Sequence, residues 1–140
     1  VLSGPGGCRL INDTYNANPA SVRAALDYAT SLEGSAWAVL GDMGELGQRK
    51  VDLHGEIGDY ARSIGVERLF TIGELSRETV ARFGAGGEHY ADLESLRDDL
   101  AGALRPDVNL LVKASRMMRL ERLVEALEAR PVVESACRES

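Results

Sequence analysis

The stretch "NLLVKASRMMRLERLVEAL", residues 109–127, contains a strand, a loop and a helix in succession. Its first four residues form a short, largely apolar run, which is typical of a buried strand. From Leu120 to Leu127, apolar residues recur at i, i+3, i+4 and i+7, a spacing that predicts a helix with one buried face. The segment between them, "KASRMMR" at 113–119, is therefore predicted to be the loop at the carboxyl end of a strand.

The same unit recurs along the chain. Further apolar runs predict strands: "RLI" at 9–11, "AWAVL" at 36–40, "RLFTI" at 68–72 and, more weakly, "EHYA" at 88–91. Segments with helical spacing follow them, around residues 22–29, 57–64, 76–83 and 93–104. Strands that are almost continuously apolar and alternate with helices form parallel sheets covered on both faces, so the fold class is α/β. We predict a Rossmann-like, doubly wound, mostly parallel sheet of about five to six strands with helices on both faces.

The composition predicts one cytoplasmic domain. The chain has 140 residues, of which 44% are hydrophobic, and a formal net charge of −6. Because Lys and Arg are scattered, we expect neither a nucleic acid nor a membrane as a partner. No apolar run reaches the roughly 18–20 residues of a membrane-spanning helix. Cys8 and Cys137 lie near opposite ends without metal-type spacing, so both are expected to be reduced thiols.

The ends of the chain predict its boundaries. "SGPGG" at 3–7 is typical of a linker, so residues 1–7 are assigned to a linker and residues 8–131 to the domain. Pro131 is expected to stop the last helix, which leaves residues 132–140 as a tail. The chain does not begin with Met, so we expect a piece of a longer protein.

Three loops at strand ends carry the candidate site, because ligands of such sheets bind at the carboxyl ends of the strands. In the first loop, Asn18-Pro19 is a typical helix start. The Asp13 carboxylate could accept hydrogen bonds from both hydroxyls of a ribose, and an aromatic ring and amides beside it suit a base and its sugar. The candidate nucleotide-binding residues are Asp13, Tyr15, Asn16 and Asn18.

The second and third loops supply charges of opposite sign. "GDMGELG" at 41–47 carries two acids and lacks the Lys-Ser/Thr ending of a phosphate-binding loop, so it suits an amine or a metal, or is simply a flexible turn. In "KASRMMR", Ser115 is expected to cap the last helix and Arg116 to lie at its N-terminus, where an anion would offset the unfavourable charge. A plain surface cation is the alternative. The candidate substrate-positioning residues are Asp42, Glu45, Lys113, Ser115 and Arg116.

Other polar residues offer less. His54 and His89 are too far apart for a metal site and are expected to be structural or solvated. Trp37 is expected in the core. No Ser/His/Asp or Cys/His arrangement is apparent, so we expect neither catalytic residues nor metal ligands within these 140 residues.

Taken together, the three loops are similar to one family. "NDTYNANPASVRAAL", "VLGDMGELG" and "VKASRMMRLERLVEAL" resemble, in order and spacing, the C-terminal domain of the Mur ligases, over roughly residues 8–129. "LHGEIG" at 53–58 is similar to the second helix of that family. "YNANP" and "LGDMGELG" are the features that point to the branch adding D-alanyl-D-alanine.

The resemblance implies an ATP-dependent ligase of peptidoglycan synthesis, and hence a role in cell-wall biogenesis, cell shape and division. An N-terminal domain would grip UDP-N-acetylmuramoyl-tripeptide, and a central domain would carry the P-loop and the Mg²⁺ ligands. ATP would convert the tripeptide carboxylate to an acyl phosphate, which the amine of D-Ala-D-Ala attacks. Asp13 would hold the ribose, while the loops around Asp42–Glu45 and Lys113–Arg116 would frame the dipeptide. The isolated domain is expected to be inactive.

Two residues depart from the family pattern, and other functions remain open. Ala114 stands where the family usually has Gly, which would cost about 1 kcal/mol if that position needs a positive φ. Asn12 stands where an acid is common. The alternatives are a signalling receiver domain, a stand-alone nucleotide-binding module, and a sister Mur or folylpolyglutamate-type ligase. A receiver needs an Asp after its third strand, whereas this chain offers only Glu74 there.

Overall fold

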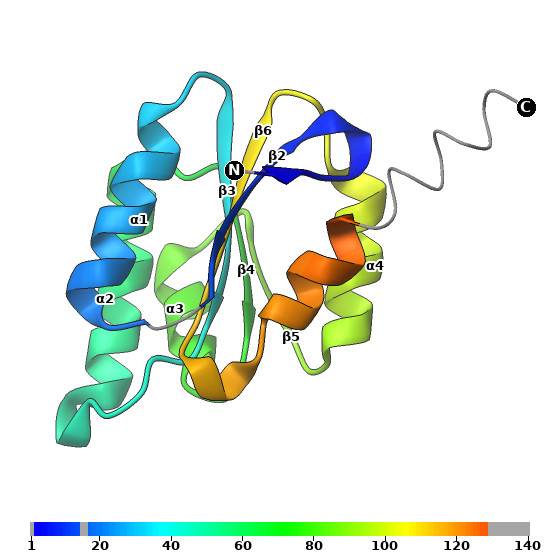
Figure 1. The fold of residues 1–140 in the computed structure, drawn as a ribbon. Helices are drawn as coiled ribbons and strands as arrows, with labels where there is room; N and C mark the ends of the chain where they lie inside the picture. The colour runs from blue at the N-terminus through cyan, green and yellow to red at the C-terminus, as the bar shows by residue number, and fades with distance from the viewer. Residues whose placement is uncertain (1, 15–16, 129–140) are drawn as a thin grey trace, which may run out of the picture.

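The computed structural model describes residues 2–14 and 17–128, which form one six-stranded sheet with helices on both faces (Figure 1). The strands are β1 (Leu2–Ser3), β2 (Arg9–Asp13), β3 (Ser35–Gly41), β4 (Arg68–Ile72), β5 (Gly87–Tyr90) and β6 (Val108–Lys113). The helices are α1 (Pro19–Ser31), α2 (Lys50–Ser63), α3 (Ser76–Phe83), α4 (Leu93–Ala103) and a further helix over residues 121–128. Short 3₁₀ turns are η1 (Pro5–Gly7), η2 (Gly47–Arg49) and η3 (Arg116–Met118).

The predicted fold class is confirmed. The strand order is β1-β2-β6-β3-β4-β5, and all neighbouring strands pair in parallel except β1, which is antiparallel to β2. All five predicted strands are present, including the weak candidate at β5. The segment assigned to a linker contributes β1 and η1, because Gly6 and Gly7 take positive φ and turn the chain back onto the edge of β2.

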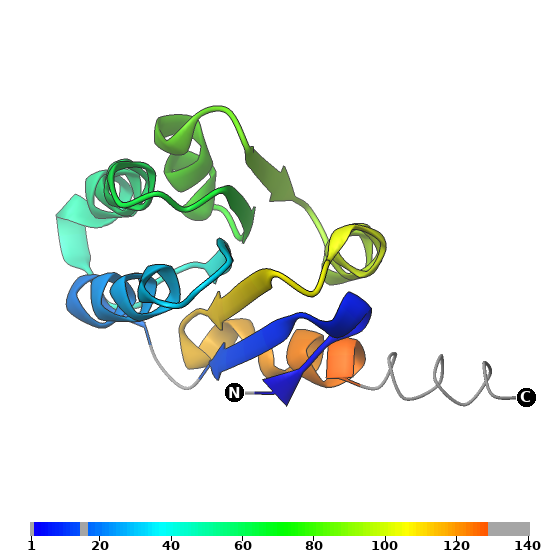
Figure 2. The ribbon, with the colours of Figure 1, turned by 90° about the horizontal axis from the view of Figure 1, so that it is seen from above.

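The sheet separates two apolar cores. Seen from above, α1, α2 and α3 lie on one side of the sheet, while α4 and helix 121–128 lie on the other (Figure 2). Trp37 and Phe70 lie in the core beneath α4, and the Trp37 Nε1–H donates to Glu67 Oε1 at 2.7 Å. Cys8 lies in the same core as a free cysteine, and burial raises the pKa of its thiol to about 11.

From β2 to β5 each new strand is added on the same side of the one before it, but β6 returns to lie between β2 and β3. The helices that follow β2, β3 and β4 cover one face, whereas α4 crosses the opposite face and brings the chain back between β2 and β3. Helix 121–128, which follows β6, stays on that opposite face. The chain therefore leaves β6 towards one face of the sheet, whereas it leaves the neighbouring strands β2 and β3 towards the other face. Such a switch in strand order is where open α/β sheets form their ligand-binding crevice.

Local sequence accounts for how α1 begins. The Asn18 side chain accepts a hydrogen bond from Ser21 N at 2.9 Å, the Ser21 hydroxyl accepts one from Asn18 N at 3.0 Å, and Pro19 is the first helical residue. The predicted start is thus confirmed, as a reciprocal capping box. Among the described residues, no helix is both long and apolar enough to span a membrane.

Candidate functional site

A cleft of about 530 Å³ lies at the carboxyl edge of the sheet, where the loops after β2, β6 and β3 meet. These three strands are adjacent and parallel, so their following loops leave from the same edge. The lining residues are Ala17, Asn18, Gly44, Glu45, Leu46, Ser115, Arg116 and Met117. The structure therefore brings the three predicted loops together in one cleft of a size typical of small-molecule sites.

Asp13 and Lys113 meet beside this cleft as an ion pair. They are register partners at the ends of β2 and β6, and Lys113 Nζ lies 2.8 Å from Asp13 Oδ2. The Lys113 side chain is only 3% exposed, whereas that of Asp13 is 44% exposed. Lys113 was predicted to position a substrate, but it is not among the residues that line the cleft, and its ammonium group is directed at Asp13. The Asp13 carboxylate is thus held by the buried ammonium group of Lys113, and it still faces solvent.

Asp42, predicted to position a substrate, caps a helix instead. Its Oδ1 accepts from Ser76 N at 2.9 Å and from Ser76 Oγ at 2.8 Å, and its Oδ2 accepts from Leu75 N at 3.3 Å. These donors belong to the start of α3, where backbone N–H groups have no partner within the helix. A Cβ at Gly73 would lie 2.5 Å from Asp42 Oδ1, so this close approach requires glycine there. Asp42 therefore fixes the base of the Gly41–Gly47 loop.

The tip of that loop does enter the cleft. Gly44, Glu45 and Leu46 all line it, and Glu45 is exposed. Glu45 has φ 56, a left-handed conformation that costs a residue with a side chain about 1 kcal/mol. The predicted acid at position 45 is thus presented to the cleft by an unusual backbone conformation, while the acid at position 42 is withdrawn from it.

The third loop differs from its predicted geometry. Arg116–Met118 forms η3, Arg119 then takes a left-handed conformation (φ 55, ψ 41), and the last helix begins only at residue 121. Ser115 precedes η3 without a side-chain capping bond, so its predicted role as the cap of the last helix is wrong. Arg116 does not lie at the N-terminus of that helix either. It nevertheless lines the cleft together with Ser115.

Ala114 carries none of the strain considered for it. Its φ is not positive, and it is completely buried in the core beneath helix 121–128. A Cβ at Gly41 would lie only 2.7 Å from the Ala114 Cβ. The position that must lack a Cβ where β3 and β6 end is therefore 41, and not 114.

The structure thus divides the nine predicted site residues. Asn18, Glu45, Ser115 and Arg116 line the cleft, Asp13 and Lys113 pair at the ends of β2 and β6, and Asp42 caps α3. Tyr15 and Asn16 lie outside the described residues. Sequence reasoning missed Ala17, Gly44, Leu46 and Met117, which also line the cleft. Leu46 and Met117 carry a signal, since each is a large apolar residue within a polar loop, and Met117 is 88% exposed.

His54, on α2, supports the loop that follows β3. It is 1% exposed, and its Nε2 accepts a hydrogen bond from Met43 N at 2.9 Å. Its Nδ1 lies 2.6 Å from Lys50 O, a carbonyl that can only accept. Of the two expected roles, structural or solvated, these contacts and the burial of the ring show the structural one.

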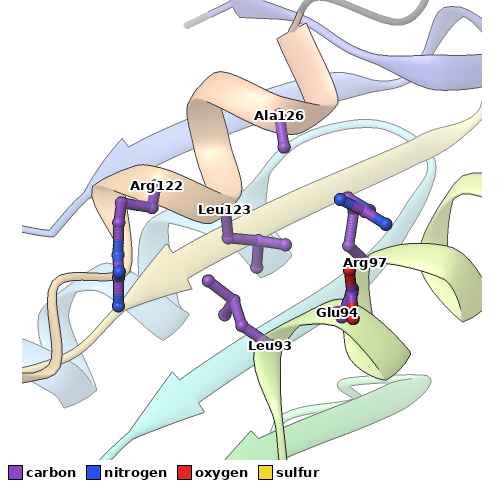
Figure 3. A pocket seen from close by; sticks show the side chains of 6 residues that line it. All are labelled: Leu93, Glu94, Arg97, Arg122, Leu123 and Ala126. Carbon is purple, nitrogen blue, oxygen red and sulfur yellow. The ribbon is translucent and has the colours of Figure 1, made fainter.

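A second hollow, of about 290 Å³, lies on the opposite face between α4 and helix 121–128 (Figure 3). Leu93, Leu123 and Ala126 form its apolar part, and Glu94, Arg97 and Arg122 stand around it. Arg97 is already bonded to Asp98, with its Nη2 3.0 Å from Asp98 Oδ1. None of the three loops lines this hollow, so it is separate from the candidate site.

The described residues do not fit a metal centre. No group of three or more His, Cys, Asp or Glu side chains in residues 2–14 and 17–128 is arranged to hold a metal ion. Glu45 is the one acid among the described residues that line the cleft, whereas Asp13 is paired with Lys113 and Asp42 binds the start of α3.

Comparison with known proteins identifies the class of domain to which this fold and edge cleft belong. Residues 1–135 match the family model described as "Mur ligase, glutamate ligase domain", and the chain therefore belongs to the Mur ligase family as its C-terminal domain. The resemblance predicted from the three loops is confirmed.

Individual relatives narrow the comparison to one branch. The chain is 36% identical over 121 residues to the UDP-N-acetylmuramoyl-tripeptide–D-alanyl-D-alanine ligase of Escherichia coli, covering 85% of this chain and 26% of that protein. It is 35% identical to the ligase of the same name from Bacillus subtilis, covering 94% of this chain and 30% of that protein. The chain thus spans about a quarter to a third of these relatives.

A solved structure has the same fold. The MurF ligase of Thermotoga maritima in complex with ADP superposes with a TM-score of 0.75 at 28% identity, covering 91% of this chain and 31% of that chain. A MurF from Acinetobacter baumannii reaches a TM-score of 0.76 over 84% of this chain, but at 24% identity it supports the fold alone.

Proposed function

We propose that this domain is the C-terminal part of an ATP-dependent ligase that joins D-Ala-D-Ala to UDP-N-acetylmuramoyl-tripeptide. The observation that carries the proposal is the convergence of the three family-specific loops on one cleft at the switch in strand order. The Escherichia coli and Bacillus subtilis relatives carry the name of this activity, and the Thermotoga maritima neighbour was crystallised with ADP.

The cleft offers one charge for each end of a dipeptide. Glu45 suits the ammonium group of D-Ala-D-Ala, and Arg116 suits its carboxylate, because both side chains line the same cleft from different loops. Ser115 adds a hydroxyl that can donate or accept a hydrogen bond. The ammonium group must lose a proton before it attacks, so Glu45 would orient the group rather than hold it permanently charged.

The nucleotide would lie on the β2 side of the cleft. Asp13 is half-exposed and is steadied by Lys113, so its carboxylate is arranged to accept hydrogen bonds from a ribose. Lys113 acts through Asp13 in this proposal. Tyr15 and Asn16 remain predicted neighbours of the nucleotide. Asn18 lines the cleft, although its own side chain is engaged in capping α1.

The domain would contribute positioning to the reaction. In this reaction class the tripeptide carboxylate takes the γ-phosphoryl group of ATP and releases ADP. The dipeptide amine then displaces phosphate, forms the amide and loses a proton. Orientation of the two reactants can account for several kcal/mol of the barrier. Since the described residues do not fit a metal centre, the Mg²⁺ that accompanies ATP would be held by the rest of the ligase.

The test uses the complete ligase that contains this domain. We expect it to consume ATP and to form UDP-N-acetylmuramoyl-pentapeptide with D-Ala-D-Ala, as measured by phosphate release and mass spectrometry. Glu45→Gln and Arg116→Gln should each raise the KM for the dipeptide by about 10-fold or more, since each removes a charge-assisted hydrogen bond. The KM for ATP should change little.

The matched control is Glu125→Gln, which removes the same charge from an exposed site on helix 121–128, outside the cleft. It should leave both KM values unchanged. Ligation of a single amino acid but not of D-Ala-D-Ala would overturn the proposal in favour of a sister ligase. Nucleotide binding without any ligation would favour a stand-alone nucleotide-binding module.

A further inference from the structure

His54 is a buried imidazole that binds one of the loops lining the cleft without lining the cleft itself. The Met43 N–H can only donate, so His54 Nε2 must be the acceptor of that hydrogen bond. The Lys50 carbonyl can only accept, so His54 Nδ1 must carry the proton. Together the two contacts assign the neutral, Nδ1-protonated tautomer. Both ring nitrogens are then used, which is what a side chain 1% exposed requires.

His54 is itself held in place by the packing of α2 on α3. The Thr79 hydroxyl donates to the His54 carbonyl at 2.8 Å. Gly58 allows the two helices to approach closely, since a Cβ there would lie 2.1 Å from Thr79 O. The imidazole therefore projects from a rigid support, and its Nε2 offers a fixed acceptor to the neighbouring loop.

That loop is held by hydrogen bonds at its base, whereas Gly44 and Glu45 at its tip make none within residues 2–14 and 17–128. Asp42 binds the start of α3 through its side chain, and its carbonyl accepts from Ser115 N at 3.1 Å. Met43 N is the next backbone donor, and it binds His54. Immediately afterwards the chain enters the cleft at Gly44 and Glu45. The hydrogen bond to His54 is thus the last one before the tip.

We propose that His54 is a positioning residue: its imidazole fixes the Met43 amide and thereby sets where Glu45 stands in the cleft. The consequence for substrate binding rests on the proposed function, whereas the effect on the loop does not. His54 acts through the backbone of the loop and touches no substrate. Loss of its acceptor should therefore raise the KM for the dipeptide much more than the KM for ATP.

Two substitutions at position 54 separate the two ring contacts. Glutamine reaches about as far as Nε2, so His54→Gln can place its amide oxygen where Met43 N–H needs an acceptor. Asparagine reaches only about as far as Nδ1, so His54→Asn can keep the Lys50 contact but not the Met43 contact. His89→Asn is the matched control, because it makes the same chemical change at a histidine that contacts Thr71 on β4 and does not line the cleft.

The loop is tested in the 140-residue chain by NMR. In the wild type we expect ¹⁵N shifts of a neutral, Nδ1-protonated His54 ring and slow hydrogen exchange at the Met43 amide. His54→Asn should speed that exchange by roughly 10-fold, the loss of one buried hydrogen bond, while His54→Gln restores much of the protection. If the Met43 amide of His54→Asn exchanged as slowly as in the wild type, the proposal would be overturned. A wild-type His54 ring protonated at Nε2 would also overturn it.

The consequence is tested in the complete ligase. His54→Asn should raise the KM for D-Ala-D-Ala about 10-fold with little change for ATP, and His54→Gln and His89→Asn should stay within about 2–3-fold of wild type. Equal effects of the Asn and Gln variants would contradict the role, as would an unchanged dipeptide KM in His54→Asn. If the wild-type ligase does not use D-Ala-D-Ala, the proposed function fails, and the Met43 exchange still decides the role of His54.

Discussion

Lys113 Nζ lies 2.8 Å from Asp13 Oδ2, and this ion pair joins the ends of two neighbouring parallel strands. The two residues are 100 positions apart in the sequence, yet they are directly opposite in the register of β2 and β6. Because Lys113 is buried and Asp13 is half-exposed, the pair connects the core of the sheet to the candidate nucleotide site. Two residues predicted for different parts of the site, Asp13 and Lys113, thus form one ion pair.

Asp13→Asn should destabilise the domain, because it removes the carboxylate that faces a buried ammonium group. We expect the free energy of unfolding to fall by about 1–3 kcal/mol, less than for a fully buried pair since Asp13 is partly solvated. Urea titration followed by Trp37 fluorescence measures it. The double variant Asp13→Asn/Lys113→Met should regain part of the loss.

Asp98→Asn is the control for that comparison, since it breaks the more exposed pair with Arg97. Its effect should stay below about 1 kcal/mol. The interpretation of Asp13 and Lys113 as a coupled unit would fail if the double variant were less stable than Asp13→Asn alone.

Gly41 and Ala114 form a second pair whose sizes are matched. Gly41→Ala should cost about 1–3 kcal/mol of unfolding free energy, because the new Cβ would lie 2.7 Å from the Ala114 Cβ. Ala114→Gly should relieve this clash in the double variant. Alone it should destabilise by about 1 kcal/mol, since it removes a buried methyl group and no positive φ is relieved. Thermal unfolding of the four proteins completes the cycle.

Gly102→Ala is the matched control for Gly41→Ala. A Cβ at Gly102 meets no atom within 4 Å, and the residue lies in α4, where alanine is the better helix former. This change should stabilise the domain by up to about 1 kcal/mol. A stabilising effect of Ala114→Gly alone would show that Ala114 is strained after all.

Asp42→Ala should loosen α3 and the cleft loop together. It removes the acceptor of three hydrogen bonds from Leu75 and Ser76, and loss of a capping side chain typically costs about 0.5–2 kcal/mol. Hydrogen exchange should rise at the first amides of α3 and at Met43. Asp92→Ala removes the cap of α4 in the same way but should leave Met43 protected. Equal protection of Met43 in both variants would refute the link between Asp42 and the loop.

The stabilising effect of Asp92 should be lost when its carboxylate is protonated in acid. The backbone N–H of Ser95 donates to this carboxylate and lowers the pKa of Asp92 below its ordinary value of 3.8. A lowered folded pKa stabilises the fold above the unfolded pKa, and that stabilisation is lost as the pH falls through the folded value. The difference in unfolding free energy between wild type and Asp92→Asn should therefore shrink from about pH 6 to about pH 3.

The control for this acid effect is Glu125→Gln, at an exposed position on helix 121–128. It removes one carboxylate, as Asp92→Asn does, but no N-cap of a helix. If the gap between wild type and Asp92→Asn grew towards low pH, the sign of the linkage would be wrong.

Local patterns were sufficient to predict most of the fold. Leu10, Val39 and Leu110 lie in runs apolar enough to require burial, and the helices between them are amphipathic. Asn18-Pro19 predicted the start of α1 because capping involves only neighbouring residues. The edge strand β1 was missed, since a two-residue strand next to glycines carries no periodic signal.

The roles of individual site residues were harder to predict. Asp42 and Glu45 are both acids of one glycine-rich loop, but only the tertiary contact with Ser76 shows that Asp42 is withdrawn from the cleft. The delayed start of the last helix depends on the left-handed conformation of Arg119, which no local preference of arginine indicates.

The sequence by itself determined the α/β class, the order of strands and helices along the chain, and the family, because burial patterns and loop motifs are local properties. Only the tertiary structure decided which charges meet. It placed β6 between β2 and β3, and so put Lys113 against Asp13. Separately, it packed α2 so that His54 contacts Met43. The physical reason is that pairings across the sheet depend on strand order and register, which residues 100 positions apart can share without any trace in the local sequence.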